Sequence, residues 1–241
     1  MRSAPLTQAD PTRTGELQRP HVLLSVATSI DGYIDDTSSE RLLLSNAADF
    51  DRVDQVRADS DAILVGAGTL RADNPRLIVN SEQRRADRLA RSLPEYPLKV
   101  TISASGDLDP ALKWFHHGGE RVVYTLDAAF AKLTQRLGAF AQVVSLGSSM
   151  DLAALLDDLA TRDVERLMVE GGEQVHTSFL TAGLVDEIHL AIAPLLVGCG
   201  PRFLASTRYP WSSSRRMQLA EARSIGDVVL LRYFPKRDSA G

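Results

Sequence analysis

The chain has 241 residues, of which 44% are hydrophobic and 24% are charged, and its formal net charge is −4. This composition is ordinary for a globular protein and excludes wholesale disorder. The negative charge balance argues against a general nucleic-acid binder, which needs a basic face. No window approaches the roughly 20 apolar residues of a membrane span, so we expect neither nucleic acid nor membrane as a partner.

The N-terminal stretch 1–20 is rich in proline and small polar residues and has no continuous apolar core. It does not fit a secretory signal, so we expect a cytoplasmic protein with a flexible tail over 1–20 and a single domain over 21–236. The one cysteine, Cys199, can form neither an internal disulfide nor a cysteine-based zinc site. The five histidines show no metal-ligand spacing, so we expect no bound metal.

In the first half of the domain, short apolar runs rich in β-favouring residues predict strands at 21–28, 61–66, 97–103 and 121–125. Between the first two, apolar residues recur at three-residue spacing among charges and predict an amphipathic helix over 45–60, carried by Phe50, Val53 and Val56. Ser45 or Asn46 can cap this helix. The arginine-rich stretch 81–95 is interpreted as a surface loop.

The second half continues the alternation, with further strands predicted at 142–146, 166–170 and 186–193. Helices are predicted at 128–137, 151–162 and 173–182. Two last strands, 217–225 and 228–234, flank Gly226-Asp227 and predict an antiparallel hairpin. The fold class that follows is α/β, with a mixed, mostly parallel central sheet, helices on both faces and a C-terminal antiparallel hairpin.

Two loops lie where ligands collect in such sheets, at the carboxyl ends of strands. The first is GAGTLRADNP, residues 66–75. Its glycines, Gly66 among them, allow a ligand close to the backbone, Thr69 offers a hydroxyl, Arg71 offers charge, and Asp73 begins a turn. A simple strand-to-helix turn capped by the threonine explains this loop about equally well.

The second loop is VEGGEQVHTSF, residues 169–179, in which Gly171-Gly172 separates a strand from a helix. Free amides and the positive end of the helix dipole would then point at one place, as a pyrophosphate requires. The spacing is not that of the G-x-G-x-x-G dinucleotide fingerprint. A glycine pair that merely turns the chain is a common alternative.

Four segments in order carry a resemblance: SVATSIDG, DAILVGAGTLRADNPRL, LMVEGGEQV and GLVDEIHLAIAPLLVGCGP. Together they resemble the reductase domain of the bifunctional deaminase-reductase of riboflavin biosynthesis, over roughly residues 21–235. The resemblance implies a dihydrofolate-reductase-like fold, NADPH as cofactor and a homodimer. It also implies a small-molecule substrate, a ribosylaminopyrimidine phosphate that is reduced to its ribitylamino form. A single cysteine leaves no pair for the deaminase zinc, so we expect the reductase activity alone.

Site residues follow from matching positions. The resemblance implies substrate contacts at Arg57, Leu77 and Glu170. It implies cofactor contacts at Thr28, Thr69, Asp73, Ser103, Gly172, Glu173, Gln174, Val175, His176, Thr177 and Ser178. The loop arguments above add Gly66, Arg71 and Gly171 to the cofactor set. No residue stands out as an obligatory acid, so the catalytic residue is left unassigned.

Departures from the family keep other functions open. Ser25 and Asn80 stand where the family typically has a lysine and a phosphate-binding arginine. A pteridine such as dihydrofolate is therefore a second substrate class, although Asn46 and Asp49 occupy the region where dihydrofolate reductases place their carboxylate. A third possible function is that of a non-catalytic NADPH-binding protein.

Overall fold

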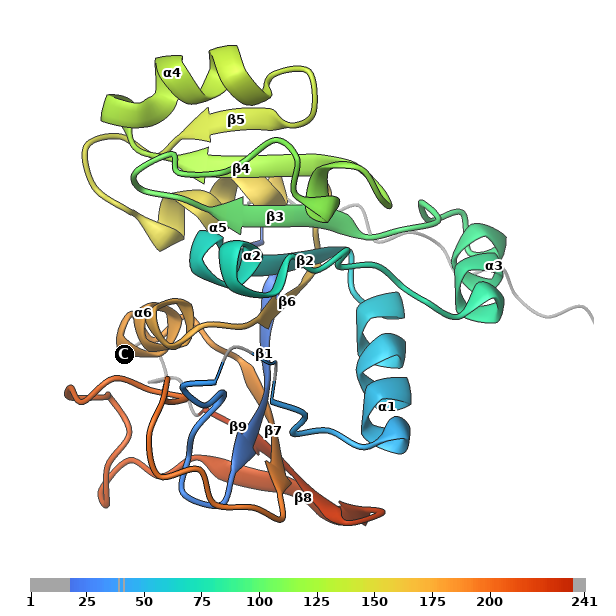
Figure 1. Ribbon diagram of the computed structural model, residues 1–241, viewed down its shortest axis with the longest axis vertical. Helices are drawn as coiled ribbons and strands as arrows, with labels where there is room; N and C mark the ends of the chain where they lie inside the picture. The colour runs from blue at the N-terminus through green and yellow to red at the C-terminus, as the bar shows by residue number, and fades with distance from the viewer. Residues whose placement is uncertain (1–17, 39, 41, 236–241) are drawn as a thin grey trace, which may run out of the picture.

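The computed structural model describes residues 18–38, 40 and 42–235. Among them, nine strands form one twisted sheet in the order β5-β4-β3-β2-β6-β1-β7-β9-β8 (Figure 1). Adjacent strands from β5 to β7 in this order run parallel to one another, whereas β9 runs antiparallel to both of its neighbours, β7 and β8. The α/β class and the terminal hairpin are thereby confirmed. The strands are β1 (His21–Ser29), β2 (Ala62–Gly66), β3 (Leu98–Ile102), β4 (Arg121–Thr125), β5 (Gln142–Ser145), β6 (Arg166–Glu170), β7 (Glu187–Ala193), β8 (Gln218–Ile225) and β9 (Val228–Phe234).

Helices cover the sheet on both faces because successive strand residues point to opposite sides. On one face, the apolar side chains of α5 and α6 pack against alternate residues of β1, β2, β4 and β6. On the other, α2, α4 and a short 3₁₀ turn, Lys113–Phe115, pack against the intervening residues. The helices are α1 (Ala47–Ala58), α2 (Ala67–Asp73), α3 (Glu82–Ala90), α4 (Asp127–Leu137), α5 (Leu152–Ala160) and α6 (Glu173–Thr181).

Helix α1 forms where it was predicted, and the Asn46 side chain caps it by accepting a hydrogen bond from the Asp49 amide at 2.9 Å. The predicted apolar face is wrong, however. Phe50 is 43% exposed, while the buried residues of the helix are Asp49, Asp54 and Ala58. These two carboxylates can be buried because neighbouring side chains and amides donate hydrogen bonds to them, which offsets the cost of removing them from water.

Two further elements correct the sequence reading. Residues 82–90, predicted to be loop, form α3, which Ser81 caps and which packs beside α1 (Figure 1). The helix is anchored by a polar residue, Arg88, which is 1% exposed and donates to the carbonyls of Ala58 and Ser60 at 2.8 and 2.7 Å. Because that anchor is an arginine, no apolar stripe marked the helix. The loop predicted over 66–75 is likewise mostly helical, as α2.

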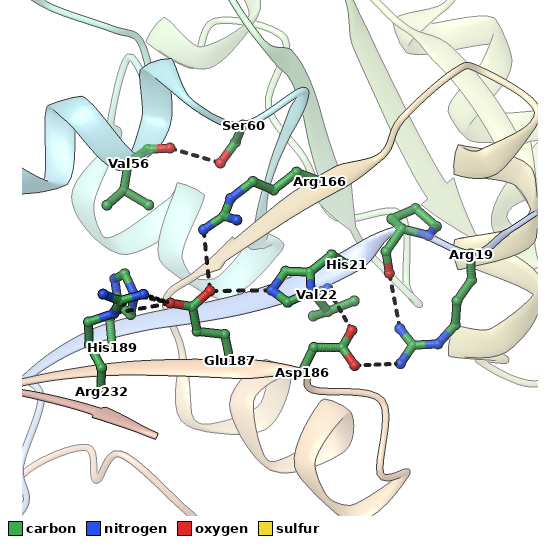
Figure 2. Close-up of polar contacts among 11 residues, drawn as sticks. Arg19, His21, Val22, Val56, Ser60, Arg166, Asp186, Glu187, His189 and Arg232 are labelled. Carbon is green, nitrogen blue, oxygen red and sulfur yellow. Dashed lines mark hydrogen bonds and ion pairs between the residues drawn. The ribbon is translucent and has the colours of Figure 1, made fainter. Parts of the chain in front are cut away.

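The predicted tail 1–20 lies largely outside the described residues, since residues 1–17 are not among them. Arg19, which is described, is attached to the domain. Its guanidinium pairs with Asp186 at 3.0 Å (Figure 2). It also donates to the Leu184 carbonyl at 3.3 Å.

A partly buried polar cluster joins the four neighbouring strands β6, β1, β7 and β9 (Figure 2). At its centre, the Glu187 carboxylate accepts from His189 at 2.7 Å, from Arg232 at 2.6 Å and from His21 at 3.3 Å, and Arg166 lies 3.4 Å away. Burial acts to raise the pKa of Glu187, but these hydrogen bonds outweigh it and hold that pKa far below its usual range. The cluster ties β1, β6 and β9 to β7.

Candidate functional site

A cavity of about 1600 Å³ opens at the carboxyl ends of β1, β2, β3 and β6. This is where open α/β sheets bind ligands, and the volume exceeds that of a typical small-molecule pocket, so a cofactor and a substrate fit together. Most of the predicted site residues line this one cavity: Arg57, Gly66, Thr69, Arg71, Asp73, Leu77, Ser103, Glu170, Gly171, Gly172, Glu173, Gln174, Val175, His176 and Ser178.

Two predicted cofactor residues are not among the lining residues. Thr28 is buried in β1, beside Ile192 of β7. The Thr177 hydroxyl accepts a hydrogen bond from the Ala205 amide at 3.0 Å, so it fastens a loop to α6. The structure gives both residues a place in the packing of the fold.

The Gly171-Gly172 turn shapes the cavity in front of α6. Both residues have left-handed backbone angles, with φ of +81° and +91°, which favour glycine. A Cβ at either position would lie 3.2 Å from the Thr69 hydroxyl oxygen of α2. The first amides of α6 have no acceptor within the helix, and its dipole is positive at this end. The turn therefore leaves room for an anionic group at a helix N-terminus.

The His176 side chain holds the Gly171-Gly172 turn in place. Its ring is fully buried, and Nε2 accepts a hydrogen bond from the Gly171 amide at 3.1 Å. Burial lowers the pKa of His176 to about 4. The imidazole is therefore neutral at physiological pH and carries its proton on Nδ1.

The two glycines of the first loop differ in their surroundings. A Cβ on Gly66 would lie 2.8 Å from the Val175 side chain, so this glycine lets β2 approach α6 closely. A Cβ on Gly68 would meet nothing within 4 Å. Packing, rather than ligand approach, accounts for the glycine at position 66.

Arg57 and Glu170 form a bidentate ion pair in the wall of the cavity. Arg57 Nε and Nη2 each donate to one carboxylate oxygen of Glu170, both at 2.6 Å, and Nη1 lies 3.3 Å from the Ile78 carbonyl. Burial acts to lower the pKa of Arg57, but Glu170 outweighs it and the net shift is upward. The pair is a fixed, charged feature of the wall that the sequence assigned to the substrate.

At another part of the cavity, Ser103 follows β3. Its hydroxyl is buried and has no hydrogen-bond partner among the described residues. Arg71 of α2 is about half exposed and donates to the Asp107 carbonyl at 2.8 Å. The Arg71 guanidinium also pairs with the exposed Asp107 carboxylate at 3.7 Å. A buried hydroxyl without a partner among the described residues, a half-exposed guanidinium and a glycine cradle at a helix N-terminus together suit a phosphorylated dinucleotide.

The sequence reasoning missed several lining residues. Arg52 of α1 donates to Asp49 at 2.7 Å and lies 3.4 Å from His189 Nδ1 of the Glu187 cluster. Arg76 follows the Asp73-Asn74-Pro75 turn and also lines the cavity. Charged residues on an exposed-looking helix or loop are usually solvated, so the sequence offered no signal that singled them out.

Across the described ranges, no set of three His, Cys, Asp or Glu side chains is arranged to hold a metal ion. In the same part of the chain, none of the helices combines the length and apolar character needed to cross a membrane.

The RibD C-terminal domain family matches residues 20–231. The 2,5-diamino-6-ribosylamino-4(3H)-pyrimidinone 5′-phosphate reductase of Archaeoglobus fulgidus is 35% identical over 75% of this chain and 83% of its own. The enzyme of the same name from Methanothermobacter thermautotrophicus is 34% identical over 90% of this chain and 99% of its own.

Solved structures show the same fold. A pyrimidine reductase-like protein from Corynebacterium diphtheriae has a TM-score of 0.75 and 24% identity, over 91% of this chain and 93% of the other. A bifunctional deaminase/reductase from Thermotoga maritima has a TM-score of 0.70 and 22% identity, and this chain spans 57% of its length.

An open, mostly parallel sheet with a large cavity at its carboxyl edge defines an α/β protein built to hold a sizeable ligand. The chain belongs to the RibD C-terminal domain family. Two of its relatives are named as pyrimidinone phosphate reductases, and another is named as a riboflavin biosynthesis protein, which supports an oxidoreductase activity for this chain.

Proposed function

We propose that this protein is an NADPH-dependent reductase that converts a ribosylaminopyrimidine 5′-phosphate to its ribitylamino form. The observation that carries the proposal is the shared cavity: the Gly171-Gly172 turn at the start of α6 and the Arg57–Glu170 pair line one space. The first suits a dinucleotide phosphate and the second a polar substrate. The names of relatives that are 34–35% identical supply the substrate class.

The cofactor half of the proposal rests on residues around α6 and β3. Amides at the start of α6, opened by Gly172, would bind the pyrophosphate, and Thr69 would border it. Bound there, NADPH would supply the hydride, which is chemistry that no side chain provides. The protein's own task is to align the two ligands and to exclude water.

The choice of NADPH over NADH is assigned to Arg71 and Ser103. A 2′-phosphate carries charge that a guanidinium and a hydroxyl can bind. Arg71 is about half exposed and pairs with the exposed Asp107 carboxylate at 3.7 Å, a contact that a phosphate could replace, and the Ser103 hydroxyl has no hydrogen-bond partner among the described residues. Binding of NADPH and NADH to Arg71→Gln tests this assignment: the variant should lose affinity for NADPH and keep its affinity for NADH.

The substrate half rests on the wall formed by α1 and the end of β6. Arg57 holds both oxygens of Glu170 in place, and each oxygen retains a lone pair that can accept from a sugar hydroxyl or an amino group. Leu77 is 4% exposed and supplies apolar surface beside the pair. Rigid placement of this kind reduces the entropy lost on binding.

The proposal includes a homodimer in the cytoplasm. On the C-terminal hairpin, Leu219 of β8 and Val229 of β9 are 52% and 43% exposed, and a second copy would cover them. Analytical ultracentrifugation tests this part, since a monomer at all concentrations would contradict it.

The function is tested by NADPH oxidation with purified protein, offered the ribosylaminopyrimidine phosphate and dihydrofolate in parallel. Turnover of the pyrimidine alone is expected. Turnover of dihydrofolate alone would reassign the cavity to a pteridine. Tight NADPH binding without consumption of either substrate would contradict the pyrimidine assignment and support a non-catalytic role.

A further inference from the structure

Arginines line the wall of the cavity near α1, and carboxylates neutralise two of them. Arg57 is paired with Glu170 at 2.6 Å, and Arg52 with Asp49 at 2.7 Å. Arg76 is different. In the part of the chain that the structure describes, no carboxylate lies within ion-pair distance of its guanidinium, whose Nη2 donates to Asn80 Oδ1 at 3.4 Å. Its positive charge is therefore available to a ligand.

The backbone that carries Arg76 is held at its first residue by a buried lysine. Lys99 of β3 is 1% exposed, and its ammonium group donates to the Arg76 carbonyl and to the His117 carbonyl, both at 2.7 Å. It also donates to the Trp114 carbonyl. Burial lowers the pKa of Lys99 to about 7. The three carbonyl acceptors still make it a fixed anchor, because moving the segment would leave the buried amino group unsatisfied.

The other end of the segment is held by a buried carboxylate. Asp54 of α1 is 6% exposed and accepts from the Asn80 amide at 2.6 Å, from Asn80 Nδ2 at 3.1 Å and from the Ser81 amide at 3.1 Å. With both ends fixed, residues 76–80 form a rigid edge of the cavity.

This edge adjoins the Arg57–Glu170 pair. Arg57 Nη1 lies 3.3 Å from the carbonyl of Ile78, midway along the segment. Arg76, Ile78 and Asn80 all line the cavity. An unpaired guanidinium therefore lies on the same wall as the proposed substrate site, on a backbone that does not need to be ordered when a ligand binds.

We infer that Arg76 binds the phosphate group of the substrate, and that Lys99 is the positioning residue that holds Arg76 at the cavity. This inference rests on the proposed function and extends it to the recognition of the 5′-phosphate. A guanidinium presents parallel N–H donors that match two phosphate oxygens. The Asn80 side chain, held by Asp54, keeps the guanidinium over the cavity wall.

The first test compares the binding of ribose 5-phosphate and of ribose by calorimetry, without cofactor. Arg76→Gln should weaken ribose 5-phosphate binding by roughly tenfold to a hundredfold, the range for a lost charge-assisted contact, and leave ribose unchanged. Arg76→Lys should restore part of the affinity. Lys132→Gln, which removes one exposed positive charge from α4, is the matched control and should behave as wild type.

Three results would overturn the inference: no binding of ribose 5-phosphate by wild type, equal binding by Arg76→Gln, or equal losses for ribose and ribose 5-phosphate.

The role of Lys99 is tested by Lys99→Arg and Lys99→Met. Both should raise KM for the phosphorylated substrate while kcat changes less, and Lys99→Arg should be the milder. A lower kcat at unchanged KM would remove Lys99 from this role.

Failure of the proposed function and failure of the Arg76 phosphate site can be told apart. If wild type does not oxidise NADPH with the pyrimidine phosphate but ribose 5-phosphate binding depends on Arg76, the proposed function is wrong and the anion site stands. If wild type turns over and Arg76→Gln has an unchanged KM, the function stands and the anchor is wrong.

Discussion

Arg57 and Glu170 lie 113 positions apart in the sequence and meet through two hydrogen bonds of 2.6 Å. The first is in the last turn of α1 and the second ends β6, so the pair fixes the distance between a helix and the carboxyl edge of the sheet. It also presents a charged, rigid surface to the cavity. The pair is therefore structural, and we propose that it also binds the substrate.

Replacing Glu170 by glutamine should lower kcat/KM by roughly tenfold to a hundredfold. The amide keeps the size of the side chain but loses the charge that matches Arg57, and a charge-assisted hydrogen bond contributes about 1.5–3 kcal/mol. Steady-state kinetics with the pyrimidine phosphate measure the effect. The exposed Glu165→Gln is the control, and equal kinetics for both variants would contradict the assignment of Glu170 to the site.

Gly172→Ala should weaken NADPH binding at least tenfold. Alanine at φ +91° is strained by about 1–2 kcal/mol, and its Cβ would lie 3.2 Å from the Thr69 hydroxyl, in the space assigned to the pyrophosphate. Gly183→Ala is the matched control, because that glycine has φ +67° and open space around it. Fluorescence titration should show that only Gly172→Ala loses cofactor affinity. Equal affinities would sink the assignment.

We expect the free energy of unfolding to depend on pH because of His176. Its folded pKa of about 4 lies below the unfolded value of about 6.5, so the unfolded chain binds the proton more readily. The stability that depends on neutral His176 is present above pH about 6.5 and is lost as pH falls towards 4, by up to about 3 kcal/mol. Protonation would also break the hydrogen bond to the Gly171 amide.

Urea unfolding at neutral pH and near pH 4.5 tests this, with His176→Gln as the comparison. Glutamine can accept from the Gly171 amide but does not titrate, so the variant should lose less stability on acidification. Parallel losses in the two proteins would show that other groups carry the acid sensitivity.

Arg88→Met should destabilise the fold by about 3 kcal/mol. The change leaves the buried carbonyls of Ala58 and Ser60, and that of Pro94, without their donor. The Ala58 carbonyl ends α1, so the loss should also loosen the helix that carries Arg57. Arg208→Met, at an exposed position far from α1 in the sequence, should change the free energy of unfolding by less than about 0.5 kcal/mol. Similar values for both variants would contradict the anchoring role of Arg88.

The sequence predicted the sheet and most helices because their patterns are local. Buried runs such as Ala62–Gly66 and the leucines of α5 follow the periods of a strand and a helix, and the Asp151 side chain caps α5. Helix α3 was missed because its anchor is a buried arginine, and the apolar face of α1 was misjudged because the helix buries aspartates instead. Burial of charge depends on partners that are distant in sequence, which periodicity does not reveal.

The site was predicted in part for the same reason. The glycine turn and the Thr69 loop are visible as local motifs, and the structure places them in one cavity. Arg76 and Lys99 could not be recognised, because the first matters through the absence of a nearby carboxylate and the second through three carbonyls from two loops. Only the folded chain brings those groups together.

The most direct test of the central claim is the transfer of deuterium from NADPH labelled at C4 of the nicotinamide to the pyrimidine phosphate. If the cavity aligns cofactor and substrate as proposed, mass spectrometry should find the label in the ribitylamino product made with one of the two C4 epimers. A product without deuterium from either epimer, or no reduced product at all, would contradict the account.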